Sequence, residues 1–180
     1  MKTTGMIRRI DDLGRIVLPK EVRKQLTIHE CDPFEIFIEE DAVVLKKYSP
    51  IRSMEDFVKD YVESLARASG HIAMVSDMEK FIAVEGGMKE LLGRPISSDL
   101  RALINSRTHF TGIKDKPGFV SIGYEQYDAY HETVKCIISS EGDKIGAVIL
   151  VDTDKKKPMN EVDEKLIQTA ADFLSKRADK

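Results

Sequence analysis

Hydrophobic and polar positions divide this 180-residue chain into two parts of different periodicity. Before residue 48, short apolar runs alternate with charged turns, a pattern typical of strands joined by hairpins. After residue 50, two longer segments carry apolar residues at helical spacing, with strand-like runs between them. Pro50 cannot continue a strand ladder and marks the boundary. The pattern predicts two domains, at residues 1–50 and 51–180.

The first part predicts a small, β-rich unit with one helix. Strands are expected at 6–10, 15–18, 33–39 and 42–46. Pro19 suits the first position of a helix on which Val22 and Leu26 share one face. A unit of about 50 residues without a disulfide or metal buries little apolar surface by itself, so we expect two chains to share one core.

Charge is concentrated at the start of the chain. Residues 1–28 carry seven bases against three acids, whereas residues 29–45 carry six acids and no base. Because bound Lys and Arg release the counterions condensed on nucleic acid, this basic segment predicts contact with phosphates. The alternative is an ordinary solvated charged face.

The run Arg8-Arg9-x-Asp-x-Leu-Gly-Arg-x-Val-x-Pro-x-Glu-x-Arg closely resembles the AbrB-type swapped-hairpin family of bacterial transition-state regulators. The resemblance covers about the first 50 residues and implies an intertwined dimer that binds double-stranded DNA. It places DNA contacts at Arg8, Arg9, Arg15, Arg23 and Lys24, to which Lys2 and Lys20 would add phosphate contacts. Many relatives have two successive arginines where this chain has Arg23 and Lys24, and lysine lacks the guanidinium fork that reads bases.

The second part predicts an α+β domain with an antiparallel sheet. Ser53 is expected to cap a helix that ends at Gly70, and a last helix is expected from Asn160 to about Arg177. Between them we expect strands at 72–76, 81–84, 119–124, 133–139 and 144–151, and short helices at 86–93 and 97–107.

This order of elements, with the run Gly-x-x-Ile-Gly-Ala-Val-Ile-Leu at Gly142–Leu150, resembles a GAF domain, a small-molecule sensor fold. The likeness implies that the domain senses a small molecule, drives oligomerisation, or both. If the two long helices lie side by side, each offers an apolar stripe to a second subunit. A dimer and a tetramer both remain open, and the resemblance favours a homotetramer.

Possible ligand contacts gather in one polar stretch, which contains Tyr124, Tyr127, Tyr130 and His131. In a GAF domain these residues would line the ligand pocket, and the alternative is a surface loop with aromatic packing. Gly86-Gly87-Met88-Lys89 lacks the spacing of a phosphate loop and predicts a turn. The Lys155-Lys156-Lys157 run is interpreted as a solvated loop.

No cofactor, metal site or enzyme activity is predicted. The four histidines have no close spacing to one another, and the two cysteines lie far apart in the chain. Cys136 alternates with Val134 and Ile138 and is expected to be a core thiol. No apolar run approaches the ~20 residues of a membrane span, so we expect a cytoplasmic protein without a membrane partner.

A swapped hairpin followed by a GAF domain resembles a family of regulators of spore-forming bacteria. That resemblance implies a transcriptional activator or repressor of late, forespore-type sporulation genes. The alternative is an antitoxin-type interaction module, because swapped-hairpin domains also head proteins whose tails neutralise a toxin. Antitoxin tails are typically short and extended, whereas residues 51–180 predict a folded domain.

Overall fold

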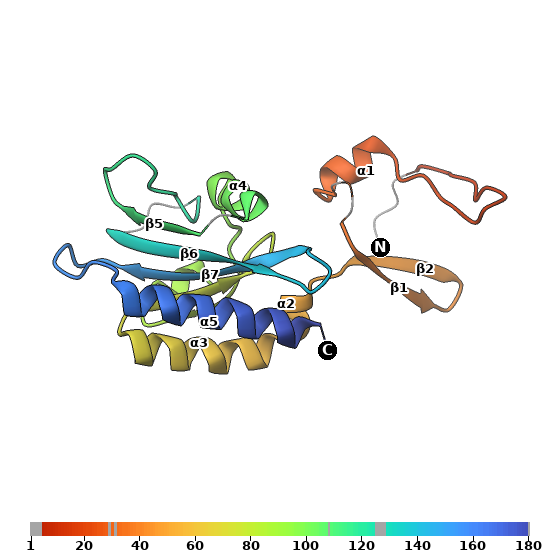
Figure 1. Cartoon of the computed structure of the whole chain (residues 1–180). Coiled ribbons are helices and arrows are strands. Elements are labelled where there is room, and N and C mark those ends of the chain that lie inside the picture. Colours follow the sequence, from red (N-terminus) through yellow and green to blue (C-terminus); the bar gives the residue numbers. More distant parts are fainter. Residues whose placement is uncertain (1–4, 29, 31, 108, 125–128, 180) are drawn as a thin grey trace. The chain divides into compact units, whose positions relative to one another are not determined.

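The computed structural model describes residues 5–28, 30, 32–107, 109–124 and 129–179, which form two compact units (Figure 1). The first unit is Met1–Tyr48 and the second is Ser49–Lys180. The boundary between the units, after Tyr48, thus lies two residues before the boundary that was expected after residue 50.

The described residues of the first unit form one helix and one β-hairpin. Helix α1 spans Lys20–Gln25, and strands β1 (Phe34–Glu39) and β2 (Ala42–Lys47) pair antiparallel. Pro19 precedes the helix as its N-cap residue. The predicted helix and the two predicted strands at 33–39 and 42–46 are confirmed.

The predicted strands at 6–10 and 15–18 are wrong for the single chain. These residues run as irregular segments on either side of a turn in which the Asp11 N–H donates to the Arg15 carbonyl over 3.0 Å. A β-strand needs a ladder partner, and within the described residues of one chain these segments have none. Their apolar side chains remain in solvent, with Ile7 87% and Val17 75% exposed.

The second unit is built on a five-stranded antiparallel sheet in the order β4-β3-β7-β6-β5. Its strands are β3 (Ile72–Ser76), β4 (Phe81–Glu85), β5 (Phe110–Ile113), β6 (His131–Ile138) and β7 (Lys144–Asp152). Strand β5 was not predicted. The strand expected at 119–124 is wrong, because this segment forms only an isolated bridge between Gly123 and Ile96.

Helices cover both faces of this sheet, as Figure 1 shows. Helices α3 (Glu55–Ser69) and α5 (Glu161–Ala178) lie side by side on one face, and α4 (Ser98–Ser106) lies on the other. Successive side chains of a strand point to opposite faces of the sheet, so the strands contribute to two apolar clusters, one against each helical layer. On β7, for example, Leu150 packs toward α3 and α5, whereas Ile149 packs in the second cluster.

The helix ends differ from the prediction in two places. Ser53 is not the cap of α3, because the short helix α2 (Pro50–Ser53) comes first and is capped by the Ser49 hydroxyl, which accepts the Arg52 N–H. The helix expected at 86–93 shrinks to the single 3₁₀ turn η1 (Lys89–Leu91), since Gly86, Gly87 and Met88 all have positive φ. The other helix ends are close to the prediction: Gly70 ends α3 in the left-handed region, and α5 begins one residue after Asn160, which is its N-cap.

Candidate nucleic-acid interface and groove

A tight turn holds the Arg15 side chain of the predicted interface. The Asp11 carboxylate accepts the backbone N–H groups of Leu13 (3.0 Å) and Arg15 (2.8 Å), and Gly14 takes a φ of +75° to close the turn. The Arg15 Nε donates to the other Asp11 oxygen over 2.8 Å. The Arg15 backbone and side-chain bonds lower the pKa of Asp11. Asp11 therefore orients an arginine whose side chain is still 69% exposed.

The other described bases of the predicted interface are exposed as well. Arg8 donates to the neighbouring Ile7 carbonyl over 2.9 Å, and Arg23 and Lys24 occupy the last turn of α1. The exposed set comprises Arg8, Arg9, Arg15, Lys20, Arg23 and Lys24. Lys2 lies outside the described residues. The turn and the helix thus leave these cations available to a polyanion.

The hairpin of the first unit has one unprotected apolar face. In the β1–β2 register Ile38 lies opposite Val43, and Ile36 lies opposite Leu45. These four side chains share a face of the hairpin, and their exposed fractions are 83%, 70%, 66% and 38% in the same order. Large exposed apolar faces on small units mark association surfaces.

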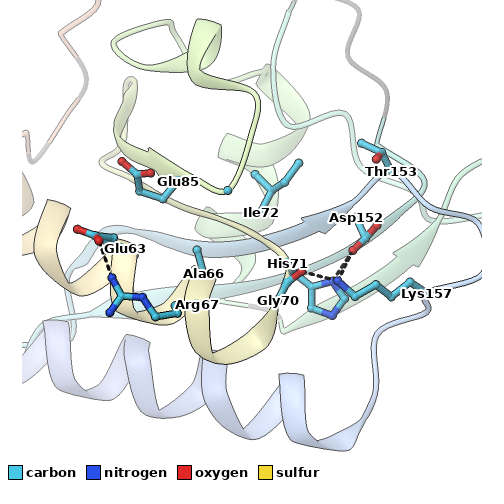
Figure 2. A pocket seen from close by; sticks show the side chains of 11 residues that line it. Glu63, Ala66, Arg67, Gly70, His71, Ile72, Glu85, Asp152, Thr153 and Lys157 are labelled. Atoms are coloured by element: carbon cyan, nitrogen blue, oxygen red, sulfur yellow. Dashed lines mark hydrogen bonds and ion pairs between the residues drawn. The ribbon is translucent and has the colours of Figure 1, made fainter.

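The second unit has a groove of about 560 Å³ at the end where α3 meets β3 (Figure 2). Figure 2 shows His71 at its floor beside Asp152 and Lys157, and an Arg67–Glu63 pair on α3. The described residues that line it also include Glu85, Gly86 and Thr153.

The buried polar groups of this groove are paired with one another. His71 Nδ1 lies 2.7 Å from an Asp152 oxygen, and His71 Nε2 lies 3.2 Å from an Asp163 oxygen. Lys157 Nζ lies 3.0 Å from the same Asp152 oxygen and also donates to the Gly70 carbonyl. The network joins the start of β3, the end of β7 and the start of α5, so it holds the fold together at this end.

The structure favours the ionised form of Asp152 in this network. Burial opposes ionisation, but hydrogen bonds from the Asp154 backbone, Lys157 and His71 outweigh it and lower the pKa of Asp152. A carboxylate with a lowered pKa stabilises the folded state above its ordinary pKa, and this stabilisation is lost as the pH falls through the folded value.

Sequence reasoning missed this network, because His71, Asp152 and Asp163 are far apart in the chain. One signal was present: Asp163 stands three residues after Asn160, and the two form a capping box at the start of α5. That signal placed Asp163 in the first turn of α5 but did not identify His71 as its partner.

The predicted ligand contacts are only partly brought together. Tyr130 packs edge-on against His131 at 4.9 Å, with Lys155 Nζ 5.0 Å above the tyrosine ring. The His131 ring also lies 3.1 Å from the Lys155 carbonyl. Tyr124 is 67% exposed, and Tyr127 lies outside the described residues. None of the three described residues lines the groove of Figure 2.

An aromatic cluster marks the outer surface of α3 and α5. The Phe173 ring of α5 stacks on Tyr61 of α3 at 5.4 Å and lies 5.9 Å from Phe57. Phe173 is nevertheless 46% exposed, and Val162 on the same helix is 63% exposed. A groove of about 330 Å³ runs beside them between Tyr61, Leu65, Val162 and Leu166. This surface combines large apolar side chains with an accessible hollow.

Two further expectations concern single chemical groups. Cys136 is 4% exposed, which confirms the core thiol, and burial raises its pKa. In the part of the chain that the structure describes, no three His, Cys, Asp or Glu side chains are placed to hold a metal ion. No helix among these residues is long and apolar enough to cross a membrane.

Two protein families match this chain. Residues 53–179 match the stage V sporulation protein T C-terminal family, described as a transcription factor. Residues 7–53 match the MazE family of bacterial antitoxins, described as antidote-toxin recognition.

The chain is similar in sequence to proteins of Bacillus subtilis (strain 168). Stage V sporulation protein T is 41% identical over 179 residues, which cover 98% of each chain. The transition state regulatory protein AbrB is 48% identical over 50 residues, which cover 28% of this chain and 52% of AbrB.

Solved structures resemble the second unit. The GAF domain of an Acinetobacter phosphoenolpyruvate-protein phosphotransferase gives a TM-score of 0.58 at 12% identity, covering 69% of this chain and 81% of that domain. A type II free methionine-R-sulfoxide reductase from Thermoplasma acidophilum gives 0.56 at 13% identity, covering 71% and 94%. At such identities the likeness shows the fold alone, which confirms the predicted GAF-like domain and carries no enzyme activity to this chain.

An AbrB-like basic head and a GAF-like antiparallel domain together define a DNA-binding transcription regulator of two domains. The chain belongs to the stage V sporulation protein T family of sporulation regulators. The predicted family is therefore confirmed, and its C-terminal family model is described as a transcription factor.

Proposed function

We propose that the first unit binds double-stranded DNA as a homodimer and that Arg8, Arg9, Arg15 and Arg23 supply most of the affinity. The observation that carries this proposal is the Asp11 turn, which presents Arg15 in a fixed orientation with 69% of its side chain exposed. Lys2, Lys20 and Lys24 add phosphate contacts. The target genes are those of late, forespore-type sporulation, by similarity to stage V sporulation protein T.

Dimerisation follows from the exposed apolar face of the β1–β2 hairpin. A second copy of the chain covers Ile36, Ile38, Val43 and Leu45 and supplies strand partners for residues 6–10 and 15–18. The result is the intertwined, swapped-hairpin core. Two-fold symmetry then presents every arginine twice to one DNA site.

The second unit oligomerises and senses a small molecule. The exposed face around Phe173 and Val162 associates with the same face of another subunit, so that two dimers form a homotetramer. The GAF-like fold supports the sensing role.

The antitoxin alternative shares the DNA-binding head and differs in the rest of the chain. A MazE family match at residues 7–53 favours it, but residues 49–180 form a folded unit of their own that matches a transcription-factor family. A folded domain is unlike the short extended tail of an antitoxin, and we therefore keep the regulator as the proposed function.

The test is a salt titration of duplex binding by the full chain, the Arg15→Ala variant and the Arg23→Ala variant. Each phosphate contact contributes about 0.9 to the slope of log affinity against log salt, and a dimer loses two contacts per variant. We expect each slope to become less steep by about 2. Lys89→Ala is the matched control, because Lys89 is an exposed base of the second unit whose side chain is 69% exposed. Binding that is unaffected by both arginine changes would move the DNA site elsewhere in the chain.

A further inference from the structure

Glu132 is an acidic residue on the apolar side of the sheet. It lies on β6 opposite Gly112 of β5 and Val151 of β7. Val134 and Cys136, two and four residues further on, pack in the apolar cluster on the α4 side. Because side chains alternate along a strand, Glu132 faces that same side, and it is fully buried.

Only one oxygen of this carboxyl group is used. Oε1 accepts the backbone N–H of Val120 over 2.7 Å. Oε2 is buried and has no hydrogen-bond partner among the described residues. An ionised oxygen in such a place is costly, because burial removes its water and nothing replaces it.

The Glu132 carboxyl group occupies space that a glycine on β5 leaves open. A Cβ atom added at Gly112 would lie 3.1 Å from Glu132 Oε1 and 2.6 Å from the Phe110 ring. Gly112 therefore leaves the space that Phe110 and the Glu132 carboxyl fill together. The neighbouring position on β7, Val151, is apolar.

No charged group of the packed elements compensates Glu132 among the described residues. His131 and Asp152 are next to it in the ladder, but they point to the α5 side, where Asp152 joins His71. The cations of α4, its C-cap and the loop are Arg101, Arg107, Lys114 and Lys116, and none of them is bonded to Oε2. Burial raises the pKa of Glu132 to about 7, against the smaller lowering effect of the Val120 hydrogen bond.

The segment that Glu132 holds is an irregular loop, residues 114–123. At its end, the backbone N–H of Ser97 donates to Ile122 over 2.9 Å, and the Ser97 hydroxyl donates to Ser121. In its middle, the Val120 bond joins it to the sheet. Asp115 and Gly118 have positive φ on the other side of Val120. Ile122 of this loop is fully buried in the apolar cluster.

We propose that Glu132 is a proton-binding site that controls this loop: the neutral carboxyl keeps residues 114–123 closed over the apolar face, and loss of the proton releases them. The proposal rests on the sensing role of the second unit and names the proton as its effector. The neutral acid still accepts the Val120 N–H through its carbonyl oxygen, whereas the ion leaves a buried charge on Oε2. Opening the loop returns that charge to water, so a rise in pH favours the open form.

Hydrogen exchange of the Val120 amide in the full chain tests this. Protection is measured between pH 6 and pH 8 and corrected for the intrinsic exchange rate. We expect it to fall about tenfold between pH 6 and pH 8, with most of the fall below pH 7, because the carboxyl in the open loop titrates near its ordinary value and both forms are ionised above pH 7. In Glu132→Gln, a neutral isostere, protection should not change with pH.

Two further variants serve as controls for the hydrogen-exchange experiment. Glu141→Gln removes an exposed carboxylate from the β6–β7 turn and should behave as the unchanged chain. Glu132→Ala removes the acceptor of the Val120 N–H, so Val120 should exchange rapidly even at pH 6. Protection that is flat in the unchanged chain, or that falls equally in Glu132→Gln, overturns the proposal.

DNA affinity measured over the same pH range separates this proposal from the proposed function. If Val120 protection depends on pH but DNA affinity does not, the result supports the Glu132 site. The same result would contradict a role for this site in controlling DNA binding. If DNA binding is lost in Arg15→Ala but the loop does not respond to pH, the DNA site stands and the Glu132 site is wrong.

Discussion

In the second unit the large apolar side chains lie inside, and in the first unit many of them lie outside. Ile149 and Leu150 of β7 are fully buried between two helical layers, whereas Ile38 of β1 is 83% exposed. All three are aliphatic residues on strands, so the difference in exposure does not come from residue type. A unit of about 130 residues can enclose a core, whereas one of about 50 buries a smaller share of its surface and is marginal by itself. The second unit therefore encloses its own core, whereas the first unit leaves exposed the apolar face that the proposed dimer would cover.

The largest effect is expected from breaking the shared core of the first unit. Ile38→Glu places a charge where a second chain covers the hairpin, and a buried unpaired charge is not tolerated. We expect loss of the head dimer and a fall in DNA affinity of roughly 100-fold or more, because paired half-sites bind together. Analytical ultracentrifugation and duplex binding measure both. Glu39→Gln, on the other face of the same strand, is the control and should keep the dimer.

A smaller effect is expected in the core that one chain completes alone. Leu150→Ala leaves a cavity between the sheet and α3 and α5, which costs about 2–5 kcal/mol of unfolding free energy. Chemical denaturation should show this loss in the second unit only. Leu92→Ala, at a site 48% exposed, should change stability by less than about 0.5 kcal/mol. Equal losses in the two variants would contradict the burial described for Leu150.

The smallest effect is expected on the outer helical surface. Phe173→Glu should convert tetramers to dimers and leave each subunit folded, because Phe173 is 46% exposed and its loss removes little core. Light scattering at several concentrations measures the assembly. Leu92→Glu is the matched control, since it adds the same charge at an equally exposed apolar site away from α3 and α5. A tetramer that survives Phe173→Glu would place the subunit contact on another face.

Patterns within short stretches of sequence predicted most elements correctly. The alternation at 33–39 and 42–46 gave the hairpin, and Gly70 and Asn160 gave the ends of α3 and α5. The expected strands at 6–10 and 15–18 failed in the single chain for lack of a partner. Strand β5 was missed because Phe110–Ile113 is only four residues long and contains a glycine.

The basic segment, the Asp-x-Leu-Gly-Arg turn and the order of the two domains could be read from the sequence, because each depends on neighbours in the chain. The His71–Asp152–Asp163 network and the buried carboxyl of Glu132 could not. In sequence, Glu132 is one charged residue between His131 and Thr133, with no sign that Oε2 would be left without a partner. Its burial arises only when β5, β7 and the loop at 114–123 close around it. The sequence alone determined which local structures form and where positive charge gathers. The tertiary structure decided which polar groups lose water, because desolvation depends on contacts between residues that are distant in the chain.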